Sequence, residues 1–474
     1  MNFLQACRSG LPAANSNSGR GREAAPTDVD EEVMRQHEFG SRRGRMAWTG
    51  ALLLACSIAS SRGAVDTDPR LKMFATQKRQ QTEALAAKLH LDVPAEAHEF
   101  FKAAEVGDWV AVSNCFEEIY RRTGLSEVSM PLPSLRNAMF IPIHETWGAY
   151  ATFRDWDATM LQKFADGILG SIPAGSVFFG GTDPGRFVIT AVRDVAKSPD
   201  VFVATPKFIM TPLRPPWEFI VTQNALVDSL YMSYLRLVYG EKLWVPSETE
   251  MQNAFQKYVT ELQLRGRQSD ERISTNRDDN VRVSGVGGVM AINSIVTKMI
   301  FDNNKNKHEF YVEESYVIPW MYPYLEPHGL IMKLNNEPLM ALDPKVVTQD
   351  RQFWDSLTKA LLADPHFTSN DAARKTFSKL RSAIGGLYAQ RRLTSESEAA
   401  FKQAVELCPS SPEANFRLAQ LYMELSREDD ALAVLTQLQK LDPLDTKLSQ
   451  AVEQVRQMKR QAEEKRRRNI PPTQ

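Results

Sequence analysis

The spacing of apolar and polar positions divides the chain into a helical first part, a mixed middle and a helical end. Residues 66–91 are rich in helix-forming side chains and predict an exposed amphipathic helix. Apolar residues then flank Gly107 and Asp108, where glycine can end one helix and aspartate can cap the next. The pattern therefore predicts a helical segment at 65–134 that contains a helical hairpin.

The middle of the chain alternates short apolar runs with helical periodicity. Two apolar runs, at 176–179 and 201–204, flank a glycine-rich turn and a helical stretch at 187–195. Strand, turn, helix and strand in this order are typical of a right-handed parallel βαβ unit. The periodicity further predicts helices at 217–239 and 245–264, a solvated loop at 265–282, an apolar helix from the glycine-rich residues 285–288 to about 301, and strands at 308–318 and 329–334. We expect residues 135–365 to form one α/β domain with a mixed sheet.

The last third of the chain repeats itself at an offset of 34 residues. Residues of the same class recur at this offset as Gly385 and Ala419, Tyr388 and Tyr422, Phe401 and Leu435, and Pro409 and Pro443. This period and these residue classes resemble the tetratricopeptide repeat, in which small residues let two helices cross closely and proline ends the second helix. The sequence predicts an all-α tetratricopeptide-like array after the α/β domain, made of a linker at 366–377, repeats at 378–411 and 412–445, a capping helix to 468 and a tail at 469–474.

The first 64 residues are expected to be a leader. After Met34, basic residues precede an apolar stretch at 47–59 and then small residues, which is the layout of a secretory signal peptide over about 34–64. Two outcomes compete, since cleavage could follow Ala59, Ser61 or Ala64, whereas residues 53–56 resemble a lipobox that would attach a lipid to Cys56. A hydrophobic helix of the fold is a third alternative. We expect a secreted or lipid-anchored extracytoplasmic protein, in the periplasm or cell envelope, with membrane tethering at the N-terminus in the lipidated case.

Composition and charge narrow the classes of function. With 43% hydrophobic and 24% charged residues, the composition is that of a globular chain, neither disordered nor multi-pass membrane. The 57 basic and 58 acidic residues give a net charge of −1, so no nucleic-acid partner is expected. Cysteines and histidines follow no metal-binding spacing, and Cys115 and Cys408 are expected to be two lone buried thiols in preference to one disulfide. We predict neither a metal nor a cofactor.

One glycine-rich turn is a candidate ligand site. It follows a predicted strand and precedes a helix, where backbone N–H groups and the helix dipole favour an anion. The alternative is a tight turn in which Asp183 caps the helix that begins at Pro184. The candidate residues of the turn are Gly180, Gly181, Thr182, Asp183 and Arg186.

A second candidate set lies ahead of the helix that follows. Gln223, Asn224 and Asp228 could present amide and carboxylate groups to a polar ligand such as a sugar or peptide, although helix capping explains the same residues. The pair His144–Glu145 lacks an identifiable nucleophile, and Glu313 and Glu314, as adjacent residues on a strand, point to opposite faces, which argues against a glycosidase-like pair. Five aromatic residues between Tyr311 and Tyr324 suit either carbohydrate stacking or core packing. Catalytic residues therefore stay unknown, and the pattern leans towards a non-enzymatic protein.

Four segments together resemble a known family. They resemble the soluble extracytoplasmic part of bacterial multi-pass proteins classed as protein O-mannosyltransferase-like, which also often end in tetratricopeptide repeats. The family's transferase chemistry belongs to its membrane part, and no such part is recognised in this sequence. The resemblance covers about 135–445 and implies fold and compartment without a glycosyltransferase activity. Its segments are 176–192, 219–236, 311–334 and 377–391.

Two functions follow from these patterns. The leading hypothesis is a non-enzymatic protein that binds a protein or peptide partner through its tetratricopeptide repeats. The alternative is an enzyme or glycan-binding accessory subunit of an envelope glycosylation system, which would bind a glycan or nucleotide-sugar in the α/β domain. A purely architectural role in an envelope assembly is the third.

Overall fold

The structure is a computed structural model that describes residues 67–123, 133–196, 219–265, 272–275, 281–284, 286–314 and 316–468. The predicted leader with Cys56, the predicted strand at 201–204 and the tail at 469–474 lie outside these residues. No helix among the described residues is long and apolar enough to span a bilayer. The described residues form two compact units, a first unit within 20–154 and 173–310 and a second unit within 155–172 and 311–474.

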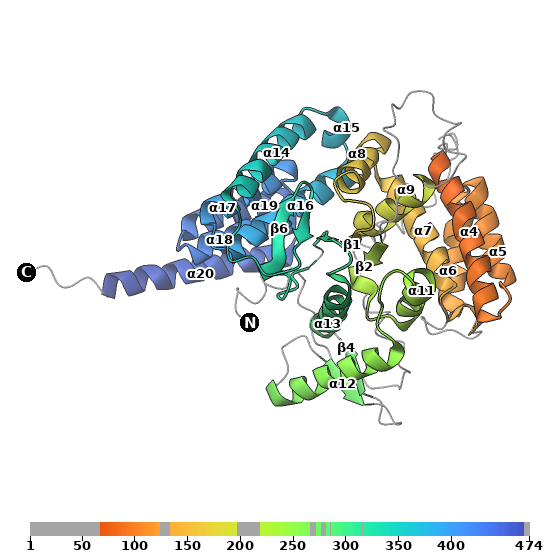
Figure 1. Cartoon of the computed structure of the whole chain (residues 1–474). Coiled ribbons are helices and arrows are strands. Elements are labelled where there is room, and N and C mark those ends of the chain that lie inside the picture. The colour runs from red at the N-terminus through yellow and green to blue at the C-terminus, as the bar shows by residue number, and fades with distance from the viewer. Residues whose placement is uncertain are drawn as a thin grey trace, which may run out of the picture. The chain divides into compact units, whose positions relative to one another are not determined.

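The first unit opens with three packed helices, α4 (Pro69–Leu89), α5 (Ala95–Val106) and α6 (Trp109–Arg122) (Figure 1). Gly107 takes the left-handed conformation at φ 90° after α5, and the Asp108 side chain accepts a hydrogen bond from Ala111 N to start α6. These caps confirm the predicted hairpin. The helix predicted at 66–91 is also present, but it is not an exposed helix, because packing against α5 buries one of its faces. The buried residues of α4 are Leu71, Phe74, Ala75, Lys78, Thr82, Leu85 and Ala86.

A parallel strand pair forms the centre of the first unit. Strand β1 (Val177–Gly180) pairs in parallel with β2 (Phe219–Thr222), in register from Val177 with Phe219 to Gly180 with Thr222. A π-helical turn (Pro184–Val188) and α9 (Ile189–Ala196) follow β1, near the predicted helix. The helix predicted at 217–239 is wrong in its first part, since the apolar and β-branched run of β2 pairs with β1. Its remainder is α11 (Ser229–Tyr239), which Asp228 caps through Leu230 N.

The rest of the first unit is mostly helical. It contains α7 (Phe140–Asp155), α12 (Glu248–Arg265) and α13 (Val286–Asn304), and the last two confirm predicted helices. The solvated loop predicted at 265–282 is wrong in part, because β3 (Arg272–Thr275) and β4 (Val281–Ser284) form an antiparallel pair there. Isoleucine, valine and threonine within the charged sequence of this region favour strands.

A mixed five-stranded sheet is confirmed, with strand order β2-β1-β5-β7-β6. Strand β5 (Phe310–Val312) is shorter than the strand predicted at 308–318. Strands β6 (Leu325–His328) and β7 (Ile331–Leu334) form an antiparallel hairpin, of which the sequence predicted only the second strand. Gly329, with φ 59°, provides the turn between them.

The second unit contains α8 (Ala158–Leu169) and a run of helices that confirms the predicted helical array (Figure 1). Residues 366–377, expected to be a linker, include most of α15 and the start of α16, because Asp364 and Asn370 cap these helices through His366 N and Ala373 N. The array therefore continues directly from the preceding helix. Its helices are α14 (Pro344–Leu362), α15 (Pro365–Thr368), α16 (Asp371–Gln390), α17 (Thr394–Leu407), α18 (Pro412–Glu424), α19 (Glu428–Leu441) and α20 (Thr446–Arg468).

Candidate functional site

The two loops that the sequence singles out meet where β1 and β2 end. The register pairs Gly180 with Thr222, so the turn at 181–186 and the segment at 223–228 leave the sheet beside each other. Asn224 Nδ2 donates a hydrogen bond to Gly181 O at 2.7 Å and joins the two loops. In open α/β sheets, ligands bind at the carboxyl ends of parallel strands. The fold thus brings the two predicted sets of candidate residues together at the edge where a ligand site is expected.

The glycine-rich turn is held by its own backbone. A Cβ atom on Gly180 would lie 2.5 Å from Gly185 O, so this approach requires glycine. Thr182 Oγ1 accepts a hydrogen bond from Gly185 N at 3.1 Å. The Asp183 side chain makes no capping bond to the helix that begins at Pro184, so the alternative interpretation of Asp183 as a cap is wrong. The Thr182 side chain instead accepts the hydrogen bond from a backbone N–H group at the start of this helix, that of Gly185.

The segment after β2 contains Asp228, which caps a helix, and Gln223, whose amide oxygen has no hydrogen-bond partner among the described residues. Asp228 accepts from Leu230 N at 2.7 Å, which confirms the capping interpretation. Burial raises the pKa of the Asp228 carboxyl, against the backbone hydrogen bonds and Arg186, which lower it. Gln223 is only 1% exposed, and its Oε1 atom has no hydrogen-bond partner among the described residues. A buried amide oxygen without a donor is costly and rare.

Arg186 is a half-buried cation at the same edge. One guanidinium nitrogen, Nη2, lies 3.2 Å from His144 Nδ1, and the guanidinium carbon lies 4.5 Å from the ring centre of Phe187. Because an arginine nitrogen can only donate, His144 accepts on Nδ1. In the described part of the chain, Arg186 forms no ion pair with a carboxylate, and its Nε atom is buried without a hydrogen-bond partner. This edge therefore carries one cation, Arg186, and the carboxylate of Asp228 is close enough to interact with it electrostatically.

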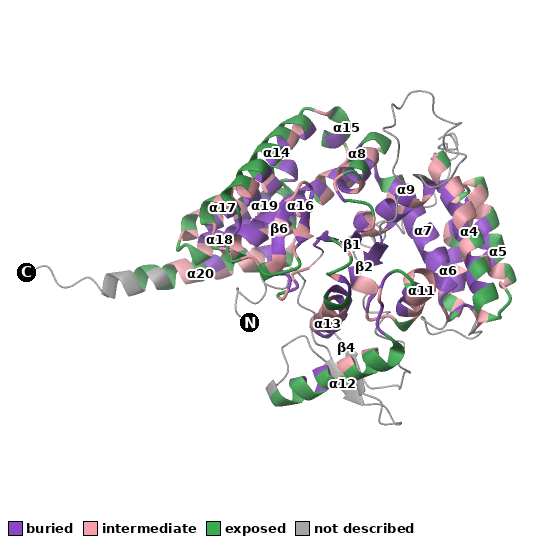
Figure 2. Cartoon of the chain, viewed as in Figure 1, coloured by how far each residue is buried: buried purple, intermediate pink, exposed green. Residues whose placement is uncertain are grey.

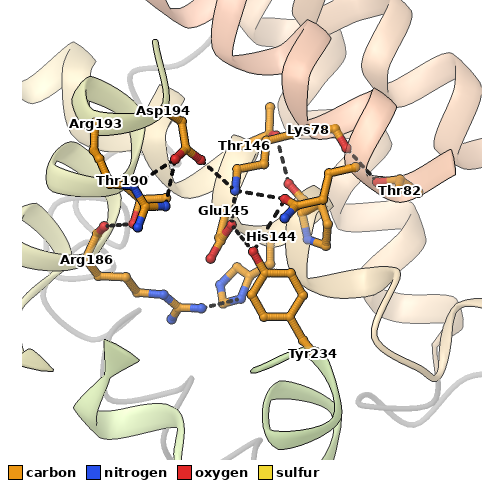
Figure 3. Close-up of polar contacts among 12 residues, drawn as sticks. Lys78, Thr82, His144, Glu145, Thr146, Arg186, Thr190, Arg193, Asp194 and Tyr234 are labelled. Atoms are coloured by element: carbon orange, nitrogen blue, oxygen red, sulfur yellow. Dashed lines mark hydrogen bonds and ion pairs between the residues drawn. The ribbon is translucent and has the colours of Figure 1, made fainter. Parts of the chain in front are cut away.

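A buried ionic cluster lies beside Arg186 in the first unit (Figure 3). Lys78 Nζ lies 2.6 Å from Glu145 Oε2, 3.1 Å from Asp194 Oδ2 and 3.0 Å from Gln81 Oε1, and its side chain is 2% exposed. The neighbours His144 and Glu145 serve different partners, Arg186 and Lys78, so they do not act as one acid–base pair. Sequence reasoning missed this cluster because its members are far apart in the chain. Lys78 and Glu145, for example, are 67 residues apart.

The charges of this cluster balance. Burial lowers the pKa of Lys78, but Glu145 and Asp194 raise it by more, so the net shift is upward and the ammonium stays charged. Arg193 Nε donates to Asp194 Oδ1 at 2.8 Å and supplies the second cation. A cavity of about 220 Å³ borders Lys78 and Asp194. Lys78 has three acceptors for its three N–H donors, so the cluster serves to hold α4 to α7 and α9 and offers no unused donor to a ligand.

The repeat-core residues occupy the positions that the period predicts. Gly385, Tyr388 and Phe401 are buried in the first hairpin of α16 and α17, and Ala419, Tyr422 and Leu435 are buried in the second hairpin of α18 and α19. Pro409 and Pro443 follow the ends of α17 and α19 and are exposed. A Cβ atom on Gly385 would lie 2.8 Å from the Phe401 ring, which shows how closely α16 and α17 cross.

The substitution Gly385→Ala is expected to destabilise the array by about 1–3 kcal/mol, because the overpacked Phe401 ring must move. This loss exceeds the gain of about 1 kcal/mol in helix propensity. At the equivalent positions the second repeat has Ala419 and Leu435. The double variant Gly385→Ala/Phe401→Leu reproduces that pair and is expected to recover part of the loss. Thermal unfolding by circular dichroism measures both, and a single variant as stable as the wild type would contradict this packing.

The first repeat is covered by the chain itself. Helix α16 is buried on nearly all sides from residue 377 to residue 388 (Figure 2). Glu314 Oε2 accepts from Tyr322 OH at 2.5 Å, and Glu314 Oε1 lies 2.9 Å from Arg417 Nη2 of α18. Arg391 at the end of α16 donates to Tyr322 O at 2.9 Å and to Pro323 O at 2.7 Å. We call residues 314 and 316–324 the covering segment; its contacts reach Arg391 at the C-terminal end of α16 and Arg417 of α18.

The contacts of the covering segment answer two questions that the sequence left open: whether Glu314 belongs to an acidic site, and whether the aromatic residues form an open carbohydrate platform. Glu314 pairs with Arg417, and Tyr322 is 7% exposed, so neither forms an open site. Tyr311 is 2% exposed and packs on His328 with ring centres 4.9 Å apart. These aromatic residues therefore belong to core packing, which rules out an open carbohydrate platform made of Tyr311 and Tyr322.

One stripe of the second repeat stays accessible. Phe416, Gln420 and Met423 lie at helical spacing on α18 and are half-buried. Phe416 and Met423 pack at the margin of a hydrophobic cluster formed by α18, α19 and α20. This stripe, named here the α18 stripe, combines apolar and amide groups on an A helix of the array.

Comparison with known proteins supports the repeat. Residues 391–455 match the family model described as tetratricopeptide repeat. The match covers α17, α18, α19 and the start of α20 and leaves out α16. No curated protein matches the chain. Repeats of this family suggest that the second unit interacts with other proteins.

The described residues contain no group of three histidine, cysteine or acidic side chains that could hold a metal ion. Cys115 on α6 is half-buried and Cys408 after α17 is buried, and both are free thiols. The two lone thiols expected from the sequence are therefore confirmed, although only Cys408 is fully buried.

Proposed function

We propose that this protein is a non-enzymatic binding protein whose C-terminal repeats hold a protein or peptide partner. The observation that carries the proposal is the tetratricopeptide match at 391–455 on two stacked helical hairpins. Stacked hairpins of this kind present extended surfaces to protein partners because each helix pair buries one face and exposes the other.

The partner binds at the second repeat. Helix α16 is buried, and the covering segment binds Arg391 at its C-terminal end and Arg417 of α18. The α18 stripe lies on the next A helix and offers Phe416 and Met423 for apolar contacts and Gln420 for a hydrogen bond. A peptide with apolar side chains matches this surface, since apolar anchors supply most of the affinity at such interfaces.

The full chain tests this proposal better than an excised repeat, since residues 378–468 alone would divide α16 and lose Asp350, whose carboxylate binds Arg381 at 2.8 Å. The variant Phe416→Ala/Met423→Ala is compared with the wild type by quantitative mass spectrometry of co-purified proteins. The matched control Lys402→Ala/Glu406→Ala changes two exposed residues of the B helix α17. We expect the partner to be lost at least tenfold in the first variant and retained in the control. Equal retention in both would contradict the proposal.

Export of the chain is part of the same proposal. Its support is the basic segment after Met34, followed by the apolar stretch at 47–59 and small residues. Mass spectrometry of the mature N-terminus distinguishes cleavage after Ala59, Ser61 or Ala64 from a lipid on Cys56, and Cys56→Ser abolishes only the lipid. A mature protein that retains residues 34–64 would contradict export.

The second candidate function is an enzyme or glycan-binding accessory subunit of an envelope glycosylation system. Its support is the resemblance of residues 135–445 to the extracytoplasmic part of protein O-mannosyltransferase-like proteins. The specific observation that favours a ligand in this region is the pair of buried atoms Arg186 Nε and Gln223 Oε1, which have no hydrogen-bond partner among the described residues.

A further inference from the structure

The described chain begins beside the turn between α5 and α6. Thr67 Oγ1 donates a hydrogen bond to Gly107 O at 2.8 Å. A Cβ atom on Gly107 would lie 2.9 Å from the Thr67 side chain and 2.8 Å from Lys72 Cε, so the start of α4 packs directly against this turn. The polypeptide that precedes Thr67 is therefore joined to the first unit at the turn.

Two exposed apolar side chains flank the same turn. Val106, the last residue of α5, is 69% exposed, and Val110, in the first turn of α6, is 66% exposed. The other exposed large apolar side chains in the described part of this unit are Leu91, which follows the opposite end of α4, and Leu264 near the end of α12. Single exposed apolar residues are ordinary, whereas two at one turn form a candidate contact surface. We call residues 106–110 the hairpin tip.

The hairpin tip also carries the residue types that occur where membrane meets water. Trp109 is half-buried, and the guanidinium carbon of Arg154, at the end of α7, lies 4.6 Å from a ring centre of Trp109. Lys72 reaches the same turn. Tryptophan concentrates at the headgroup level of bilayers because its ring is apolar and its N–H group is polar, and lysine and arginine are attracted to lipid phosphates.

The sequence ahead of Thr67 argues for a bilayer as the occupant. Cys56, the predicted lipid site, lies eleven residues before Thr67, and the apolar stretch at 47–59 ends eight residues before it. Eleven residues span at most about 40 Å when fully extended. A tether at either place therefore keeps the hairpin tip close to the bilayer at a high effective concentration. Attachment by one acyl chain is marginal, and a second contact strengthens it.

We propose that the hairpin tip, with Lys72 and Arg154 beside it, rests on the surface of a lipid bilayer and places Val106 and Val110 in the headgroup region. The bilayer then removes the two valines from water, and the two cations face lipid phosphates. This inference rests on the tethered form of the proposed export and is independent of partner binding by the repeats.

Quenching of tryptophan fluorescence by brominated lipid tests this placement, since bromine quenches only tryptophans that reach the bilayer. The full chain is added to vesicles of phosphatidylcholine and phosphatidylglycerol, with and without brominated acyl chains. Trp109 reports the hairpin tip, and Trp48, in the apolar stretch, reports the tether. We expect bromination to quench the wild type more strongly than Trp109→Phe and more strongly than Trp48→Phe.

Two double variants assign the contact to the valines. Val106→Ser/Val110→Ser removes the apolar contact and is expected to lower the quenching due to Trp109 at least twofold. The matched control Leu91→Ser/Leu264→Ser changes two exposed leucines of the same unit away from the hairpin tip and is expected to leave this quenching unchanged.

The outcomes separate this inference from the tether on which it rests. Quenching of Trp48 without quenching of Trp109 would overturn the inference and leave the tether in place. Quenching of neither tryptophan would overturn both. A wild-type dimer in light scattering without vesicles that Val106→Ser/Val110→Ser loses would show that a second copy of the chain covers the hairpin tip, and the bilayer proposal would then be wrong.

Discussion

Replacing Lys78 with methionine is expected to lower the free energy of unfolding of the first unit by about 3–5 kcal/mol. Methionine fills much of the space of the lysine side chain, so the loss is electrostatic. Glu145 and Asp194 would keep their negative charges at a site where the Glu145 side chain is 6% exposed. Only Arg193 would then remain to neutralise them, and Tyr234 OH, 3.3 Å from Glu145, cannot supply a charge.

The control is an ion pair with the same nitrogen–oxygen distance on the surface of the protein. Lys298 of α13, in the first unit, lies 2.6 Å from Asp302, and its side chain is 36% exposed, so Lys298→Met is expected to cost no more than about 1 kcal/mol. The double variant Lys78→Met/Glu145→Gln removes one charge of each sign and is expected to recover part of the loss. Native-state hydrogen exchange of the α4 and α7 amides follows the first unit separately from the second. A loss below about 1 kcal/mol in Lys78→Met would show that the ionic cluster is not needed to hold these helices.

The contribution of Lys78 is also expected to be constant through neutral pH. Its pKa in the folded protein lies above the ordinary lysine value, so the stabilisation is fully present below the unfolded pKa of about 10.4. It disappears only as the pH rises through the folded pKa. The difference in stability between the wild type and Lys78→Met should therefore be the same at pH 6 and pH 8, as far as this lysine is concerned.

Replacing Arg417 with methionine is expected to destabilise the second unit by about 3–5 kcal/mol, because Glu314 loses its cation inside the protein. The side chain of Glu314 is 5% exposed, and its remaining partner, Tyr322 OH, is neutral. Burial raises the pKa of Tyr322, and Glu314 raises it further, so the tyrosine stays protonated and donates to the carboxylate. The covering segment should then exchange its amide protons faster than α18 and α19 do.

Arg427 provides a matched control on the same hairpin. It lies 2.8 Å from Glu398 and 2.6 Å from Asp430, but its side chain is 39% exposed. Arg427→Met is therefore expected to cost no more than about 1 kcal/mol. Hydrogen exchange of residues 316–324 in both variants measures the effect. If Arg417→Met left this exchange as slow as in the wild type, Arg417 would not hold the covering segment.

The sequence predicts the helical parts of this fold well because their determinants are local. Gly107 and Asp108 act within one turn of the helices that they end and begin. The array follows from residue classes repeated at one offset, and Gly385 and Phe401 occupy the positions that this repetition assigns to them. Strand β2 was missed because its four residues fit a helical period as well as a strand, and only pairing with β1 separates the two.

The candidate site at the edge of β1 and β2 shows which features of a site the sequence predicts and which it does not. The sequence singled out the turn at 180–186 and the segment at 223–228, and the parallel register of β1 and β2 brings them together. It did not indicate which side chains would be left unpartnered. That depends on neighbours such as His144, which lies 42 residues before Arg186 in the chain and takes one of its N–H groups.

The amino-acid sequence alone predicts many of the helices, the helical repeat and the residues of the repeat core, but it does not predict α7, α8 or α14. Tertiary structure alone decided which charges are paired and which face of the repeats is covered. Glu145 is 67 residues from Lys78, and Glu314 is 103 residues from Arg417. The physical reason is that caps and helical periods depend on backbone groups a few residues apart, whereas a buried charge selects its partner through the packing of the whole unit.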